Sequence, residues 1–116
     1  MRARVDDFHW VDLDTRGSDW DPAHAWELLQ IFVGPQGEPG SESFQLVVCT
    51  PSALAERLRS HPFLLGRHLL FVPELHPDKV TAWIADRVAT LEAPTWRELA
   101  EKVGRIGAWE FEDHDS

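Results

Sequence analysis

Two dense apolar runs separated by a turn rich in glycine and proline constrain the fold of this chain most. Residues 26–33 read WELLQIFV, and residues 43–49 read SFQLVVC. The connecting GPQGEPG, residues 34–40, resembles collagen triplets but is too short for a triple helix, so it predicts a turn. Apolar runs of this length bounded by turn residues are typical of buried strands. The sequence therefore predicts a central antiparallel hairpin with a long loop.

Shorter patterns of the same kind predict the remaining strands. Apolar or alternating stretches indicate three more strands, at residues 2–11, 68–72 and 109–112. In the last of these, Trp109 and Phe111 are expected to point inward. Residues 12–22 are predicted to form a polar, acidic loop.

The first of three expected helices follows the hairpin directly. It is predicted to begin at Thr50 and Pro51, because threonine can cap free backbone N–H groups and proline suits the first helical position. The helix would run to about Arg59. Its expected inner residues are Leu54, Ala55 and Leu58.

Two further helices are indicated by apolar residues at helical spacing. The second would begin at residues 76–78 and end near Leu91, and its apolar face comprises Val80, Trp83, Ile84, Val88 and Leu91. The third would begin at Thr95, which forms a capping-box pattern with Glu98. Its inner stripe comprises Trp96, Leu99, Ala100, Val103 and Ile106.

This order of elements predicts an α+β fold. We expect a mostly antiparallel sheet of about five strands with about three helices packed on one face, which leaves the other face open to water or to a partner. The 116 residues fit a single domain, 1–116. A domain of this size buries roughly two-thirds of the surface of its unfolded chain and needs no disulfide.

Charge is distributed unevenly along the chain. The net charge is −9, and between Val5 and Glu56 ten acidic residues accompany one basic residue, Arg16. Such a field repels phosphate backbones, so nucleic acid is not an expected partner, and it attracts a basic one. The alternative is that the acidity only keeps the protein soluble.

Several sequence features bear on location. Cys49 is the only cysteine, which excludes an intramolecular disulfide. The N-terminal residues include no apolar core of a signal peptide, and no apolar run approaches the ~20 residues of a membrane span. A cytoplasmic protein that does not enter a membrane is expected.

The reactive residue types do not form a pattern that indicates an enzyme. The six histidines have no metal-ligand spacing, and Cys49 ends an apolar strand, where a buried thiol is expected. The paired carboxylates fall in polar loops or at outward positions of a strand. No catalytic residue, metal or cofactor is predicted. A deep pocket with His24 or His68 beside a carboxylate would indicate an enzyme instead.

Several segments together resemble a known family. They are LLQIFVGP at 28–35, GSESFQLVVCTP at 40–51, LGRHLLFV at 65–72, and Thr95-Trp96 with IGAWEF at 106–111. In order and spacing they are similar to the immunity protein 8 family of bacterial polymorphic-toxin systems. The resemblance implies an α+β fold, no enzymatic activity, and a protein that binds the toxin encoded beside it. It supplies no binding residues.

The main hypothesis is an immunity protein that binds a cognate, basic toxin domain one to one and so protects the producing cell. The predicted contact is an acidic face with Trp20 as an aromatic anchor. Trp20 could instead tether its own loop to the core.

The alternative function is a non-catalytic adaptor that packs on a larger assembly through the open sheet face. The sequence does not determine the oligomeric state. The predicted toxin-binding residues are Asp12, Asp14, Asp19, Trp20, Asp21, Glu38 and Glu42.

Overall fold

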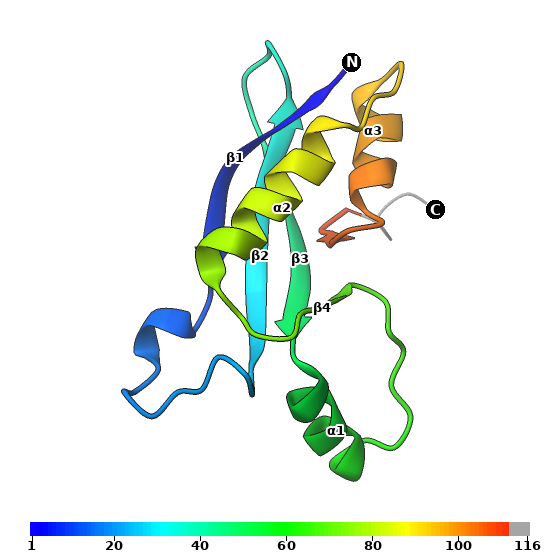
Figure 1. The fold of residues 1–116 in the computed structure, drawn as a ribbon. Helices are drawn as coiled ribbons and strands as arrows, with labels where there is room; N and C mark the ends of the chain where they lie inside the picture. Colours follow the sequence, from blue (N-terminus) through cyan, green and yellow to red (C-terminus); the bar gives the residue numbers. More distant parts are fainter. Residues whose placement is uncertain (112–116) are drawn as a thin grey trace.

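A computed structural model describes residues 1–111 of the chain as a twisted sheet with two helices across one face and a third at its end (Figure 1). The order of elements agrees with the sequence prediction, with one short 3-10 helix (η1) added. The elements are β1 Ala3–Trp10, η1 Leu13–Thr15, β2 Trp26–Pro35, β3 Glu42–Cys49, α1 Pro51–Ser60, β4 Leu69–Phe71, α2 Pro77–Ala89, α3 Trp96–Val103 and β5 Ala108–Trp109.

The long hairpin of β2 and β3 forms the centre of the sheet. β1 pairs antiparallel with β2, and β2 pairs antiparallel with β3 from Trp26 opposite Cys49 to Val33 opposite Glu42. β4 and β5 share the other edge of β3, where β4 runs parallel to it and β5 antiparallel. The parallel pairing follows from the crossover through α1, which returns the chain to the start of β4 in the direction of β3.

A β-bulge in β1 explains an irregularity in its apolar pattern. Val5 pairs with Val33 and Phe8 pairs with Ile31, and the register shifts between Val5 and Asp7. Without the extra residue, side chains three positions apart would lie on opposite faces of the strand. The bulge therefore lets both Val5 and Phe8 pack against the same core.

The core lies between the sheet and the helices α2 and α3. Alternate residues of β2 and β3 are buried on one face, because successive side chains of a strand point to opposite faces. They pack with one stripe of α2 and one of α3. The fully buried side chains include Leu29, Ile31, Val33, Phe44, Val48, Ile84, Val88, Leu99, Ala100 and Val103.

These observations confirm the predicted α+β class, and they change the place of α1. This helix continues β3 beyond the end of the sheet, whereas α2 and α3 cover the sheet face (Figure 1). Of its residues only Ala53 is buried, so the inner face predicted from Leu54, Ala55 and Leu58 is wrong. A helix at the end of a sheet buries a narrow stripe, and periodicity alone does not determine which stripe it is.

Two other side chains lie elsewhere than predicted. Trp83 of α2 is 51% exposed, because Val80, Ile84 and Val88 already fill the contact with the sheet. Phe111 is also exposed, since β5 ends at Trp109. The predicted end of this strand at residue 112 lies outside the described residues.

The three helices begin where the sequence predicts, and one of the two predicted capping hydrogen bonds is present. The Thr95 hydroxyl accepts a hydrogen bond from the Glu98 N–H at 3.2 Å, as a capping residue does. Thr50 instead accepts from the Ala25 N–H at 3.0 Å, which ties the start of α1 to the start of β2. Among residues 1–111, none of the helices has the length and apolar character that a membrane crossing requires.

Candidate functional site

The loop between β1 and β2 carries most of the predicted binding residues. Asp12, Asp14, Asp19 and Asp21 are all exposed, and their loop lies at the end of the sheet where β2 begins (Figure 1). We call residues 12–21 the acidic loop. Four carboxylates on one short segment give it a strong local negative potential.

A buried carboxylate holds the acidic loop in place. Glu27 is 3% exposed and accepts two hydrogen bonds from the Arg16 guanidinium, at 2.9 and 3.0 Å. The hydrogen bond to Glu27, followed by the negative charge of Glu27, raises the pKa of Arg16 above its ordinary value. The Trp20 indole N–H donates to the same carboxylate at 3.1 Å. Both loop residues are therefore fixed to the start of β2.

The position of Trp20 agrees with the tethering alternative. Its ring is half-buried and packs against the core, and its N–H is engaged by Glu27. The ring therefore presents less surface than an exposed anchor would. A toxin contact by Trp20 stays a prediction.

A second set of side-chain contacts joins His24, which follows this loop, to α1. His24 Nδ1 lies 2.9 Å from the Ser52 hydroxyl, and His24 Nε2 lies 2.5 Å from a Glu56 carboxylate oxygen. Serine, histidine and glutamate in contact resemble a hydrolase triad, whose histidine must take the serine proton. Here the Ser52 hydroxyl donates to the Ala23 carbonyl oxygen at 3.0 Å, and the groups are exposed. This arrangement fits a structural tie between the loop and the helix.

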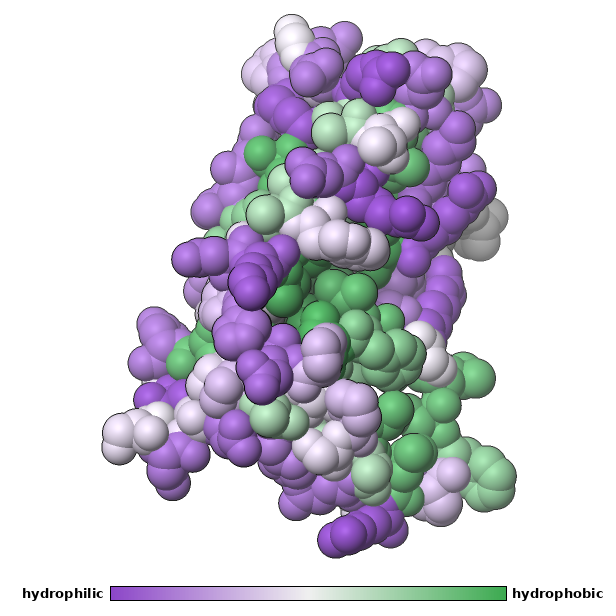
Figure 2. Space-filling model, viewed as in Figure 1, coloured by the Kyte–Doolittle hydropathy of each residue, from purple (hydrophilic) through white to green (hydrophobic). Residues whose placement is uncertain are grey.

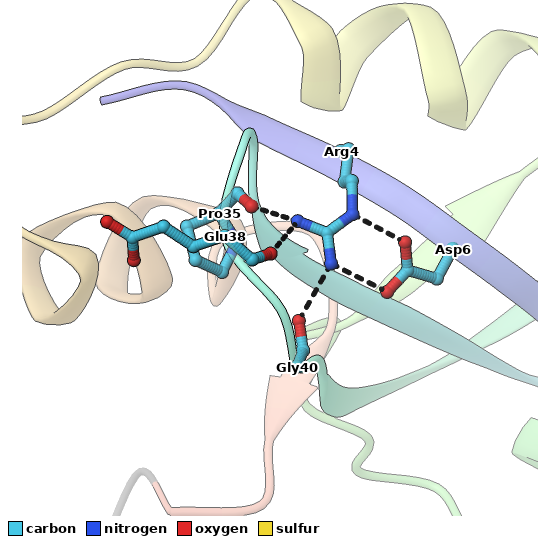
Figure 3. Close-up of polar contacts among 5 residues, drawn as sticks. All are labelled: Arg4, Asp6, Pro35, Glu38 and Gly40. Carbon is cyan, nitrogen blue, oxygen red and sulfur yellow. Dashed lines mark hydrogen bonds and ion pairs between the residues drawn. The ribbon is translucent and has the colours of Figure 1, made fainter.

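Glu38 and Glu42, the other predicted binding residues, lie at the opposite end of the hairpin. Figure 3 shows the Arg4 guanidinium directed at the turn, where it donates to the carbonyl oxygens of Pro35, Glu38 and Gly40 while it pairs with Asp6. Glu42 accepts from the Trp109 indole N–H at 2.6 Å.

The turn itself requires glycine at position 34. A Cβ on Gly34 would lie 2.0 Å from the Gly40 carbonyl oxygen, so a side chain there would force the two strands of the turn apart. Arg4 and Gly34 together fix the backbone that carries Glu38.

The predicted acidic residues therefore form two separate groups. β2 spans the whole distance between the acidic loop and the turn that carries Glu38, so the seven residues do not make one continuous face (Figure 1). Sequence charge counts could not reveal this, because they do not say at which end of a strand a loop lies.

The other reactive residues of the described chain have structural contacts. Cys49 is buried, and burial raises the pKa of its thiol. His68 Nε2 donates to the Gly104 carbonyl oxygen at 2.6 Å. Within residues 1–111, no three His, Cys, Asp or Glu side chains form a cluster that could hold a metal ion.

An exposed apolar surface was not foreseen from the sequence. Phe63, Leu65, Phe71 and Trp83 are 94%, 89%, 55% and 51% exposed, and we call these four residues the apolar surface. Figure 2 shows hydrophobic side chains gathered around a hollow in this part of the molecule. The signal was the sequence Phe63-Leu64-Leu65 between Pro62 and Gly66, which is an apolar run too short for a paired strand.

Phe71 and Trp83 belong to the walls of a groove between β4 and α2. The groove has a volume of about 610 Å³. Its walls are mostly apolar, and its acidic residue, Glu74, pairs with His76 at 3.0 Å. Contiguous exposed apolar surface commonly marks a site of interaction with another molecule.

The chain is a small α+β domain with an exposed acidic loop and an exposed apolar groove. The family model described as Immunity protein 8 matches residues 7–114, and the chain belongs to this family of immunity proteins. The resemblance seen in the sequence is thereby confirmed. Families of this kind are generally non-catalytic and bind a toxin protein. A comparison with curated proteins and with solved structures found no match.

Proposed function

We propose that this protein binds a cognate toxin domain one to one in the bacterial cytoplasm and neutralises it without catalysis. Family membership supports the class of partner. The observation that carries the proposal is the acidic loop, whose carboxylates are exposed while its Arg16 and Trp20 side chains are bound to Glu27. A binding segment that is already ordered loses little conformational entropy on association.

The charge of the loop indicates the chemistry of the toxin surface. A loop with four carboxylates complements a basic surface, such as the substrate groove of a nuclease. Complementary charge accelerates association, and close charge pairs at interfaces couple by about 1.5–7 kcal/mol. The Asp side chains of this loop are therefore the expected contacts, and their effect should weaken as salt is added.

Co-expression tests this function. The toxin domain encoded beside this gene is expressed in a sensitive bacterium, with and without this chain. Growth should be restored by the wild-type protein and lost with D12K/D14K/D19K/D21K, while circular dichroism shows the variant still folded. If the wild-type protein does not restore growth against an active toxin, the proposed function is wrong. Full protection by the folded variant would overturn only the role of the loop.

The alternative of a non-catalytic adaptor draws support from the open sheet face. Leu28, Phe32 and Val47 lie on the face opposite the core and are half-buried. An adaptor that used this face would bind with little dependence on salt, and F32S would abolish its assembly. Toxin binding that is unaffected by F32S argues for the immunity function.

A further inference from the structure

The apolar surface is the feature that the acidic loop does not explain. Phe63 and Leu65 project from the connection between α1 and β4, and Phe71 and Trp83 line the groove beside it. Single exposed apolar residues are ordinary, but a gathered set around a hollow is not (Figure 2). Bulky side chains around a groove are the usual anchors of a protein interface.

Two basic side chains of α2 lie beside Trp83, although the whole chain has a net charge of −9. On α2, Lys79 and Arg87 lie one turn before and after Trp83, and the Arg87 guanidinium lies 5.7 Å from the Trp83 ring. A partner that fits here has apolar side chains with carboxylates near them.

The overall charge distinguishes among partners of that chemistry. An anionic membrane or a nucleic acid presents an extended negative field, which a molecule of charge −9 would meet with repulsion. A folded protein can present a few carboxylates close to an apolar anchor and basic groups elsewhere. The charge pattern therefore favours a protein partner.

The acidic loop and the groove lie close enough for one partner to contact both. The Leu75 N–H donates to the Pro22 carbonyl oxygen at 2.8 Å, which joins the residue after the acidic loop to the segment after β4. Glu74 and His76, on either side of Leu75, line the groove. A backbone hydrogen bond therefore connects the segment that follows the acidic loop to the segment that lines the groove.

We propose that the apolar surface is the anchoring half of the toxin interface and receives apolar side chains ringed by carboxylates, while the acidic loop contacts a basic region of the same toxin domain. This inference rests on the proposed function. It predicts a toxin surface with two regions of opposite charge. The apolar anchors set mainly the lifetime of the complex, and the acidic loop sets mainly the rate of association.

Binding kinetics of the purified toxin domain test the proposal. The dissociation rate is measured for the wild-type protein, for F63S/L65S, for W83S and for the control F111S. Phe111 is partly exposed, packs edge-to-face on Trp109 and does not line the groove. F63S/L65S and W83S should each release the toxin at least tenfold faster, and F111S should stay within threefold of wild type. Because Phe63, Leu65 and Trp83 are exposed, these variants should keep their fold, which circular dichroism verifies.

Charge reversal tests the chemistry of the partner. K79E/R87E should weaken binding at least tenfold if carboxylates face Trp83, and stronger binding would overturn that assignment. Unchanged dissociation of F63S/L65S and W83S would overturn the anchoring role and leave the proposed function standing. Absence of wild-type binding would overturn the proposed function itself.

Two other occupants are tested directly. A wild-type dimer by light scattering that F63S/L65S converts to monomer would assign the surface to a second copy. Binding to phosphatidylserine vesicles that F63S/L65S removes would assign it to a membrane. Either result would overturn the toxin assignment of this surface.

Discussion

Glu27 is the residue on which the position of the acidic loop depends. Its carboxylate is buried at the start of β2 and accepts from both Arg16 and Trp20. A buried acceptor with charged and neutral donors is stabilising only while the donors remain, and the donors are ordered only while the acceptor remains. Local order in the loop is therefore linked to a core position.

Removal of this carboxylate should lower the free energy of unfolding. We expect E27A to destabilise the protein by roughly 1–3 kcal/mol, because the half-buried Trp20 N–H loses its acceptor. The matched control is E56A, whose carboxylate is exposed and pairs with His24, and its expected effect is below about 1 kcal/mol. Urea denaturation followed by tryptophan fluorescence measures both. Equal effects of the two substitutions would contradict the role given to Glu27.

Cys49 gives the protein a dependence of stability on alkaline pH. Burial raises the pKa of its thiol, whereas the thiol of the unfolded chain titrates near its ordinary pKa of about 8.5. A raised pKa in the folded state means that the stabilisation is fully present below about pH 8.5 and is lost as pH rises towards the folded pKa. The free energy of unfolding should therefore fall with pH above this point.

Comparison with C49A isolates this contribution. Between pH 8 and pH 10 the wild-type protein should lose stability faster than C49A, by at most about 1.4 kcal/mol per pH unit. Chemical denaturation across this range provides the measurement. Parallel curves for the two proteins would show that Cys49 is not the group responsible.

Among the helices of residues 1–111, α3 is the one whose start is capped by a side chain. The Thr95 hydroxyl accepts from the Glu98 N–H, and α3 buries Leu99, Ala100 and Val103. We expect T95A to destabilise the protein by about 0.5–2 kcal/mol, the usual effect of a lost N-cap.

The control for this prediction is T81A in α2. The Thr81 hydroxyl donates to the Asp78 carbonyl oxygen and supports no helix terminus, so the better helix propensity of alanine should leave stability within about 0.5 kcal/mol of wild type or slightly above it. Thermal unfolding measures both. A larger loss in T81A than in T95A would contradict the capping assignment.

The elements could be predicted from the sequence largely because their signals are local. The hairpin of β2 and β3, the starts of α1 and α2, and the cap of α3 follow from apolar runs, prolines and one threonine. The inner face of α1 and the exposure of Trp83 could not be predicted, because both depend on which elements pack beside them. Helical period selects a stripe only when a single face is covered.

The binding surfaces were predicted less completely than the fold. The acidic residues were identified from composition, but their division between two ends of the hairpin follows from the direction of β2. The sequence allows two roles for Trp20, as an anchor or as a tether. It does not reveal Glu27 as the partner of Trp20, because a glutamate inside an apolar strand gives no sign of what it contacts. The groove depends on the tertiary arrangement that brings Phe71 of β4 and Trp83 of α2 to its walls.

At the scale of the whole molecule, the elongated shape separates the two acidic groups. The principal extents are 43 × 31 × 22 Å, and Glu38 and Glu42 lie on the hairpin end far from the groove. A toxin seated on the acidic loop and the apolar surface would lie away from them. E38K/E42K should therefore change the association rate less than threefold, whereas D12K/D14K/D19K/D21K should slow it at least tenfold at low salt. Stopped-flow mixing with the purified toxin domain measures both rates, and the reverse order would place the toxin on the turn.

The central claim is that this chain binds and inhibits the toxin domain encoded beside it. Isothermal titration calorimetry with the two purified proteins, at low and at high salt, tests it most directly. We predict a one-to-one complex whose affinity decreases as salt rises and whose formation abolishes toxin activity. No heat of binding at either salt concentration, with both proteins folded and the toxin active, would contradict the claim.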